Sequence, residues 1–268
     1  MPYNLSITQR QRSNKMLKFS DANAKTKQLS KVAMLSQQYL DNGRKIVSLD
    51  ISSGWSCPFA NDCLSKVHII NSKRKIKDGP KTKFRCFSAS QEALFPPVYE
   101  ARKHNYDLLR STNFVGMSKM ISEAIPKKTG IIRIHVGGDF FNQDYFDSWL
   151  AVAKSHPHIL FYAYTKSLTY WIKRRANRDI PKNFILTASR GGRLDHLIKP
   201  KRLREAIVVF SENEANRLNL DIDHDDSHAA NPAIKKQNFA LLIHGIQPKG
   251  SEASQALSAL KGKGSYKR

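Results

Sequence analysis

The sequence IIRIHVGGDFFNQDYFDSWLAVAKSHPHILFYAYT, residues 131–165, predicts a strand, a helix and a second strand. Its two ends, Ile131 to Val136 and Ile159 to Tyr164, are short and almost continuously apolar, as strands buried on both faces are. Between them, Asn142 to Ser155 places its large apolar residues on one face of a helix, and Asn142 is a favourable N-cap. A strand–helix–strand unit of this kind predicts two parallel strands in one sheet.

The same alternation continues on both sides of this stretch. Four more strands are predicted, at Lys45 to Ile51, Phe184 to Ala188, Ala206 to Phe210 and Phe239 to Ile243. Further helices are predicted at Ala24 to Leu40, Gln91 to Thr112, Val115 to Ile125 and Ser251 to Leu260. The chain is therefore expected to be an α/β protein of parallel strand–helix repeats. A six-stranded partial barrel of the TIM type and an open doubly wound sheet both satisfy this pattern.

We expect one folded domain with two loose ends. Residues 1–22 are polar and basic and predict a flexible arm, residues 23–262 predict a single α/β domain, and residues 263–268 predict a basic tail. Within the domain, residues 52–90 contain all three cysteines and a basic run, Lys73 to Lys77, and are expected to form an inserted loop region. A hydrophobic content of 40% is sufficient for a core of this size.

The charge balance points to a negatively charged partner. The chain has 45 Lys and Arg against 22 Asp and Glu, which gives a formal net charge of +23. A surplus of this size repels itself unless a polyanion neutralises it, so nucleic acid or another polyanion is the expected partner. The charge does not distinguish DNA from RNA, and a solvated basic surface is the alternative explanation.

Nothing in the sequence predicts a membrane segment or a secretory signal. The longest apolar runs are far shorter than the roughly 20 residues that cross a bilayer, and residues 1–15 lack an apolar stretch. Three cysteines are an odd number, and a chain of 268 residues does not need disulfides for stability. We therefore expect a cytoplasmic protein, of an oligomeric state that the sequence does not reveal.

Polar or glycine-rich segments follow every predicted strand, and in parallel α/β folds the carboxyl ends of the strands are where ligands bind. The turn Gly137-Gly138-Asp139 would let a ligand approach the backbone, although a tight turn into the next helix explains it equally well. The segment Ser189 to Arg193 could hold an anion through backbone N–H groups and arginine. Tyr164, Lys166, His244 and Lys249 end or follow other strands and would line the same edge.

The three cysteines, Cys57, Cys63 and Cys86, do not have the paired spacing of a zinc finger. Free cysteines are often simply buried, and that is the alternative for all three. However, they lie together in one polar region directly after a strand, which is unusual for inert core cysteines. Three thiolates would suit an iron–sulfur cluster that keeps one iron free for a non-protein ligand.

Three cysteines after the first strand, followed by Gly-Gly-acid after the second, resemble the layout of radical S-adenosylmethionine (SAM) enzymes. The resemblance implies that Cys57, Cys63 and Cys86 hold a [4Fe–4S] cluster and that Gly137, Gly138 and Asp139 bind SAM. It also implies a six-stranded partial barrel. In its mouth, Ser189 and Lys249 would contribute to cofactor binding, and Tyr164, Lys166, Arg190 and His244 would be catalytic candidates. The match departs from that family in the wide spacing of the cysteines and in Asp139, where Glu is commoner.

A second resemblance is to an uncharacterised family of phage-encoded proteins. It rests on Arg133-Ile134-His135-x-x-Gly138-Asp139-Phe140, on Tyr145 and Trp149, and on Phe161 to Ser167. It covers about the middle third of the chain and implies a phage setting, hence the host cytoplasm, but no reaction.

These observations lead to three hypotheses about function. The first is a radical-SAM-like iron–sulfur enzyme that acts on or beside nucleic acid, on a substrate the sequence does not name. The second is a non-catalytic, basic nucleic-acid-binding phage protein with structural or zinc-binding cysteines. The third is a metal-dependent nuclease or replication-associated enzyme that would use Asp139, His135 and the acidic segment around Asp223.

Overall fold

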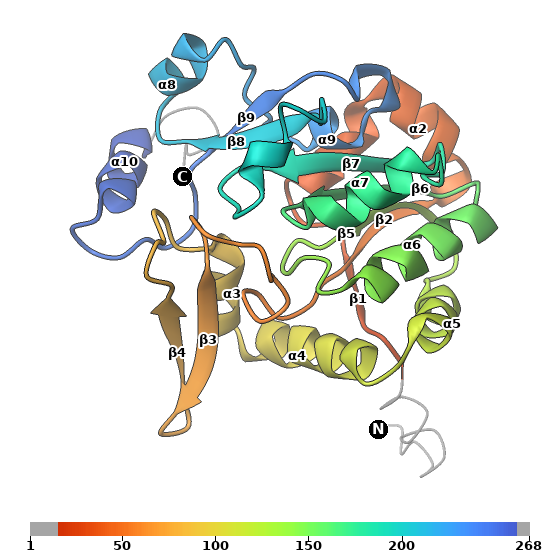
Figure 1. Ribbon diagram of the computed structural model, residues 1–268, viewed down its shortest axis with the longest axis horizontal. Coiled ribbons are helices and arrows are strands. Elements are labelled where there is room, and N and C mark those ends of the chain that lie inside the picture. Colours follow the sequence, from red (N-terminus) through yellow and green to blue (C-terminus); the bar gives the residue numbers. More distant parts are fainter. Residues whose placement is uncertain (1–15, 262–268) are drawn as a thin grey trace.

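The computed structural model describes residues 16–261, which form one mainly parallel sheet with helices on both faces (Figure 1). Seven strands lie side by side in the order β1-β2-β5-β6-β7-β8-β9. Every strand from β2 to β9 runs parallel to its neighbours in this sheet, whereas β1 pairs antiparallel with β2 at one edge. Their bounds are β1 Phe19–Asp21, β2 Lys45–Leu49, β5 Thr129–Ile134, β6 Leu160–Thr165, β7 Phe184–Ser189, β8 Glu205–Val209 and β9 Phe239–Leu242.

The six predicted strands are confirmed, and they occupy the sheet in their order along the chain. The order does not reverse at any point, unlike the order in a doubly wound sheet. The seventh strand, β1, lies inside the segment predicted as a flexible arm; at three residues it is too short to show an alternating pattern. The rest of that arm, up to residue 15, and the predicted tail lie outside the described residues.

One face of the sheet packs against the helices that connect the strands. These are α4 (Pro96–Arg110), α5 (Phe114–Ala124), α6 (Gln143–Ser155) and α7 (Leu168–Ala176). Alternate strand residues point to this side, and Trp149 of α6 is fully buried among them. The predicted helix residues 142–155 therefore form the expected amphipathic helix, with the Asn142 side chain accepting a hydrogen bond from the Tyr145 N–H at 2.8 Å.

The opposite face, called here the inner face, is covered by the N-terminal segment and by the short helix α9 (Ser227–Ala230). Leu29 of η1 (Thr26–Lys31) and Leu35 of α2 (Ala33–Tyr39) pack with Ile46, Ile131 and other inner-face residues. The remaining elements are η2 (Asp41–Gly43), η3 (Asp195–Leu197), α8 (Glu212–Arg217), η4 (Pro232–Ile234) and α10 (Glu252–Leu260). Between residues 16 and 261, no helix is both long and apolar enough to cross a membrane.

The region 52–90, predicted as a loop, contains regular structure instead. Strands β3 (Ser65–Ile70) and β4 (Lys73–Asp78) form an antiparallel pair, and α3 (Phe87–Leu94) follows them. Figure 1 shows this pair extending away from the main sheet. The two strands were not predicted because β4 does not alternate between polar and apolar residues. Its exposed lysines alternate with Arg74, Ile76 and Asp78.

Candidate functional site

The three cysteines lie at the carboxyl end of β2, beside the turn that follows β5. Cys57 and Cys63 belong to the loop after β2, and Cys86 immediately precedes α3. All three are free thiols of intermediate exposure. The backbone N–H of Cys86 donates to the Ser65 Oγ at 3.2 Å, which ties the third cysteine to the strand that follows the second.

The cysteines are close enough to influence one another electrostatically. Burial raises the pKa of the Cys57 thiol well above its usual value, and negative charge on Asp139, Cys86 and Cys63 raises it further. Burial and Cys63 likewise raise the pKa of Cys86, although backbone N–H groups of Ala89 and Ser88 at the start of α3 oppose the rise. Uncompensated thiolates are therefore disfavoured here, and a bound cation would reverse that balance.

The thiols do not converge on a single point. No group of three His, Cys, Asp or Glu side chains within residues 16–261 is arranged to hold one metal ion. Thus the structure brings the three predicted cysteines into one neighbourhood without building a single-ion site from them.

The glycine turn after β5 packs directly on the cysteine loop. The Ile51 N–H donates to the Gly137 carbonyl oxygen at 3.0 Å, and the Asp139 N–H donates to the Ser56 Oγ at 3.3 Å. Gly138 has a φ of +99°, and a Cβ there would lie 2.4 Å from Cγ1 of Ile51. Close packing against the cysteine loop thus requires glycine at this position.

Asp139 is buried and its carboxylate is already hydrogen-bonded within the protein. It accepts from the Thr165 hydroxyl at 2.6 Å and from the N–H groups of Lys166 and Phe140 at 2.8 and 2.7 Å. Burial raises the pKa of Asp139 to about 6, despite these donors and the nearby Lys166 charge. The side chain therefore joins the ends of β5 and β6, and a ligand would meet the backbone of this turn more readily than its carboxylate.

Lys166, Ser189 and Arg190 form one hydrogen-bonded cluster at the ends of β6 and β7, in which Lys166 is buried and the other two are partly exposed. The Lys166 ammonium donates to the Ser189 hydroxyl at 2.7 Å and to the carbonyl oxygens of Ser189 and Arg190, both at 2.9 Å. The Arg190 guanidinium pairs with Glu205 at 2.6 Å. The expected anion cradle is internally occupied, because the N–H groups of Gly191 and Gly192 donate to Asp195.

His244 follows β9 and faces Phe87, the first residue of α3, with ring centroids 4.4 Å apart. Its Nδ1 lies 3.1 Å from the Leu242 carbonyl oxygen, and a carbonyl only accepts, so Nδ1 carries the proton of the neutral ring. Burial among protein atoms lowers the pKa of His244, although the ring remains accessible to solvent. Its Nε2 is therefore an unprotonated acceptor at neutral pH. Lys249 is exposed, beyond β9 and before α10.

A buried charged network on the inner face went largely unpredicted. Tyr164 belongs to it, since its hydroxyl donates to Asp223 at 3.2 Å and the Arg133 guanidinium lies over its ring. Asp226 pairs with Arg133 at 2.5 Å and with Lys25 at 2.9 Å. Of this acidic segment, Asp223 and Asp226 are buried and have partners inside the fold, whereas the Asp221 side chain is exposed. Arg133 lies two residues after Ile131 in β5, so its side chain points to the same inner face. This spacing is the feature of the sequence from which a buried arginine could have been predicted.

The residues of the predicted nuclease site are not brought together. His135 is buried, and its Nε2 lies 2.9 Å from the Tyr145 hydroxyl on the helix-covered face. Burial lowers the pKa of His135 to about 3, so the ring is neutral. Asp223, in contrast, lies with Tyr164 on the inner face.

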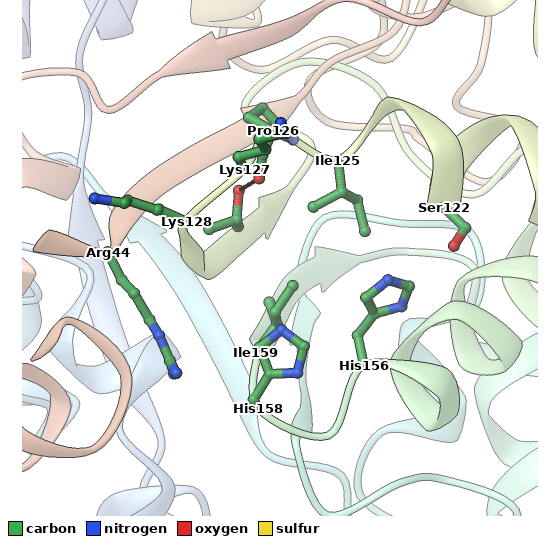
Figure 2. A pocket seen from close by; sticks show the side chains of 10 residues that line it. Arg44, Ser122, Ile125, Pro126, Lys127, Lys128, His156, His158 and Ile159 are labelled. Carbon is green, nitrogen blue, oxygen red and sulfur yellow. Dashed lines mark hydrogen bonds between the residues drawn. The ribbon is translucent and has the colours of Figure 1, made fainter. Parts of the chain in front are cut away.

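Two cavities lie near the sheet. One, of about 350 Å³, is bounded by β1, β2 and α4, and Ser48, Asp50, Arg102 and Val136 contribute to its wall. The Asp50 carboxylate also accepts from the Val136 N–H at 2.6 Å, so this cavity adjoins the turn after β5. The second, of about 290 Å³, is lined by residues at the amino ends of the strands (Figure 2), whereas the cysteines lie at the carboxyl end of β2.

Figure 2 shows that basic and histidine side chains surround the second cavity, including Arg44, Lys127 and His158. His156, which precedes Pro157, caps the end of α6, where its Nδ1 lies 2.9 Å from the Val152 carbonyl oxygen. The pair His156 and His158 therefore belongs to a turn between α6 and β6, as the intervening proline indicates.

Fold and site together define an α/β protein with a cysteine-bearing site at the carboxyl edge of a mainly parallel sheet. The chain belongs to the Gene product 88 family, which it matches over residues 11–261. It is 27% identical to the Gene 88 protein of Mycobacterium phage L5 and 26% identical to that of Mycobacterium phage D29, each over 132 residues. Each match covers 46% of this chain and 48% of the relative, about half of either protein. No solved structure matches the chain.

Family membership confirms the predicted kinship with phage proteins. The radical-SAM resemblance is separate from it and is not part of what these relatives establish.

Proposed function

We propose that this protein is a radical-SAM-like iron–sulfur enzyme that acts on or beside nucleic acid. The observation that carries the proposal is the position of Cys57, Cys63 and Cys86. They are mutually close at the end of β2, and the glycine turn at the end of the adjacent strand β5 packs on their loop.

The donor set suits a cluster better than a single ion. All three side chains are thiols, which are the ligands iron–sulfur clusters use. Thiolates bind separate corners of such a cluster, so the lack of a single-ion site among residues 16–261 does not count against it. The pKa values of Cys57 and Cys86 are raised by burial and by neighbouring negative charge, a cost that cationic iron would offset.

Held by Cys57, Cys63 and Cys86, a reduced cluster would supply one electron for cleavage of a C–S bond of SAM, with methionine released and hydrogen abstracted from a substrate. The protein's own residues would hold and orient the reactants. The cavity of about 350 Å³ beside Asp50 and Val136 falls within the usual range of small-molecule sites. Its contact with the turn after β5 favours that turn as the binding place for SAM.

The strand order also supports the proposal. Six parallel strands that follow one another in the sheet without reversal have the order of a partial barrel. In such a barrel the carboxyl ends of the strands would form the mouth, and half-buried Tyr164, near the end of β6, would lie there.

The residues at the mouth would have distinct roles. Lys166 is a positioning residue, because its ammonium fixes the segment that contains Ser189 and Arg190. His244 would accept a proton at Nε2, since its Nδ1 proton is committed to Leu242. Lys249, exposed near the same edge, would attract an anionic group of the cofactor or the substrate.

The experiment is anaerobic purification, followed by iron and sulfide analysis and a visible absorption spectrum. We expect a brown protein with stoichiometric iron and sulfide, and loss of both in Cys63→Ser. The control variant is Ser258→Ala on α10, an exposed position away from the cysteines. A folded protein that stays colourless after reconstitution, or a Cys63→Ser variant with a full cluster, would contradict the proposal.

A further inference from the structure

The β3–β4 pair carries a continuous basic surface on one side. In its register, Lys66 lies opposite Lys77, His68 opposite Lys75, and Ile70 opposite Lys73. Directly paired residues of an antiparallel ladder point to the same side, as do alternate residues along one strand. We call this side, formed by these six residues, the lysine face.

The other side of the pair is fixed to the protein. The Arg74 guanidinium donates to the Ala93 carbonyl oxygen of α3 at 3.1 Å, and Ile76 is partly buried. At the base, the Ser65 hydroxyl donates to Asp78 at 2.7 Å, and Asp78 pairs with Arg85. The lysine face is consequently turned to solvent, and Lys73, Lys75 and Lys77 are all exposed.

No member of the lysine face is acidic, so its charges have no partner within the face. Lysines directly opposite one another, such as Lys66 and Lys77, repel and weaken the ladder. Alternate side chains of β4 are about 6.6–6.8 Å apart, which gives an extended row of ammonium groups. A row of cations of this kind can neutralise phosphates along a nucleic-acid strand.

An exposed aromatic ring borders this surface. Trp55, in the loop that carries Cys57, has its indole N–H bonded to the Val67 carbonyl oxygen and is 46% exposed. The Lys66 ammonium lies 4.6 Å from its ring centroid, and His68 is 5.0 Å away. An exposed indole beside ammonium groups is typical of surfaces that contact both phosphates and bases.

From these contacts we infer that the lysine face binds the phosphate backbone of nucleic acid and brings it to the cysteine site. The inference rests on the nucleic-acid partner in the proposed function and assigns that partner a binding element. The pair is inserted between Cys63 and Cys86, and the Ser65 hydroxyl accepts from the Cys86 N–H. A strand held on the lysine face is therefore held at a fixed position relative to the cysteines.

The test compares the natural protein with three variants in fluorescence anisotropy with labelled single-stranded and duplex DNA and RNA. The variant of the lysine face, called the ribbon variant because β3 and β4 form a two-stranded ribbon, is Lys73→Gln/Lys75→Gln/Lys77→Gln. The control variant Lys45→Gln/Lys127→Gln/Lys182→Gln loses the same charge at exposed positions near the amino ends of β2, β5 and β7. A third variant, Lys73→Arg/Lys75→Arg/Lys77→Arg, keeps the charge on the lysine face. Circular dichroism and Tm confirm that all are folded.

We expect the ribbon variant to bind about 10–100-fold more weakly near 0.15 M salt, while the control and the arginine variant stay close to the natural protein. The slope of log K against log salt should become shallower by about 0.9 per lost contact on duplex DNA, or about 0.7 on a single strand. The probe among the four that the natural protein binds most tightly identifies the form of nucleic acid.

The inference is overturned if the ribbon and control variants lose affinity equally, because net charge alone would then explain binding. If the natural protein binds none of the four nucleic acids, the inference and the nucleic-acid part of the proposed function both fail. The cluster part is decided separately by iron and sulfide content.

Discussion

The side chains that connect the N-terminal segment to the inner face of the sheet meet at one carboxylate, Asp226. Burial alone would raise the pKa of Asp226, but Arg133, Lys25 and the Tyr162 hydroxyl together lower it to about 2. Its side chain is 1% exposed. Removal of a charge buried this deeply leaves its partner unpaired, which costs more than the pair itself contributes.

Asp226→Asn should therefore lower the free energy of unfolding by about 3–5 kcal/mol. The natural carboxyl has a lower pKa folded than its ordinary value of 3.8, so its contribution is present above about pH 4 and is lost as the pH falls toward 2. The free energy of unfolding should fall by about 2 kcal/mol over this pH range in the natural protein, and Asp226→Asn should not show this pH dependence. Urea denaturation between pH 2 and 6 measures both effects.

Asp144→Asn is the control, since Asp144 is exposed in the first turn of α6 and should contribute less than about 1 kcal/mol. Equal losses in the two variants would show that Asp226 is not a buried ion-pair partner.

At the scale of elements, the turn after β5 and the loop after β2 are held together by backbone hydrogen bonds. Gly138 and Gly250 provide a matched comparison for this contact. Both have positive φ, +99° and +81°, but only Gly138 would place a Cβ against neighbours, whereas Gly250 has nothing within 4 Å.

Gly250→Ala should cost about 1–2 kcal/mol, the penalty for a left-handed conformation. Gly138→Ala should cost several kcal/mol more, because its methyl group would overlap Ile51, and it should also reduce iron incorporation. Thermal denaturation and iron analysis of both variants provide the measurement. Equal costs would mean that the turn and the cysteine loop are not in contact.

The elements of the core were predictable because burial leaves a strong trace in the sequence. Strands covered on both faces, such as Leu160–Thr165, consist almost wholly of apolar residues, and α6 shows a clear apolar stripe. The β3–β4 pair lacks that trace, because its lysine face is basic and its other side carries Arg74, which donates to Ala93 of α3, half-buried Ile76, and Asp78, which pairs with Arg85. β4 does have the two-residue alternation of a strand, but its exposed lysines alternate with half-buried residues of which two are also charged.

At the scale of the whole molecule, the net charge of +23 should make stability depend on salt. Like charges repel across the surface at low ionic strength, where the Debye length is about 30 Å, and are screened when it falls to about 8 Å. We expect Tm to rise between 10 and 150 mM NaCl. The rise should be smaller in the variant with three glutamines on the lysine face. Scanning calorimetry measures it, and a Tm that falls over this range would contradict the prediction.

The arrangement of strands in space was only partly predictable. Polar residues at strand ends could be assigned to one edge, because parallel strands share their direction, and the sheet brings Asp139 and Lys166 together there. Their partners could not be foreseen. The Asp139 carboxylate accepts a hydrogen bond from the Thr165 hydroxyl, and this pairing depends on the exact conformation of the turn, which the sequence pattern does not specify.

The base of the β3–β4 pair has a consequence for how relatives can diverge. Ser65, Asp78, Arg85 and the backbone of Cys86 close the two ends of the pair on each other. The number of residues between the second and third cysteines is thereby uncoupled from the distance between them. Insertions or deletions at the Asn71–Ser72 tip should therefore accumulate in related chains without displacing Cys86. The length of the β3–β4 pair can then change in evolution while the cysteine site stays the same.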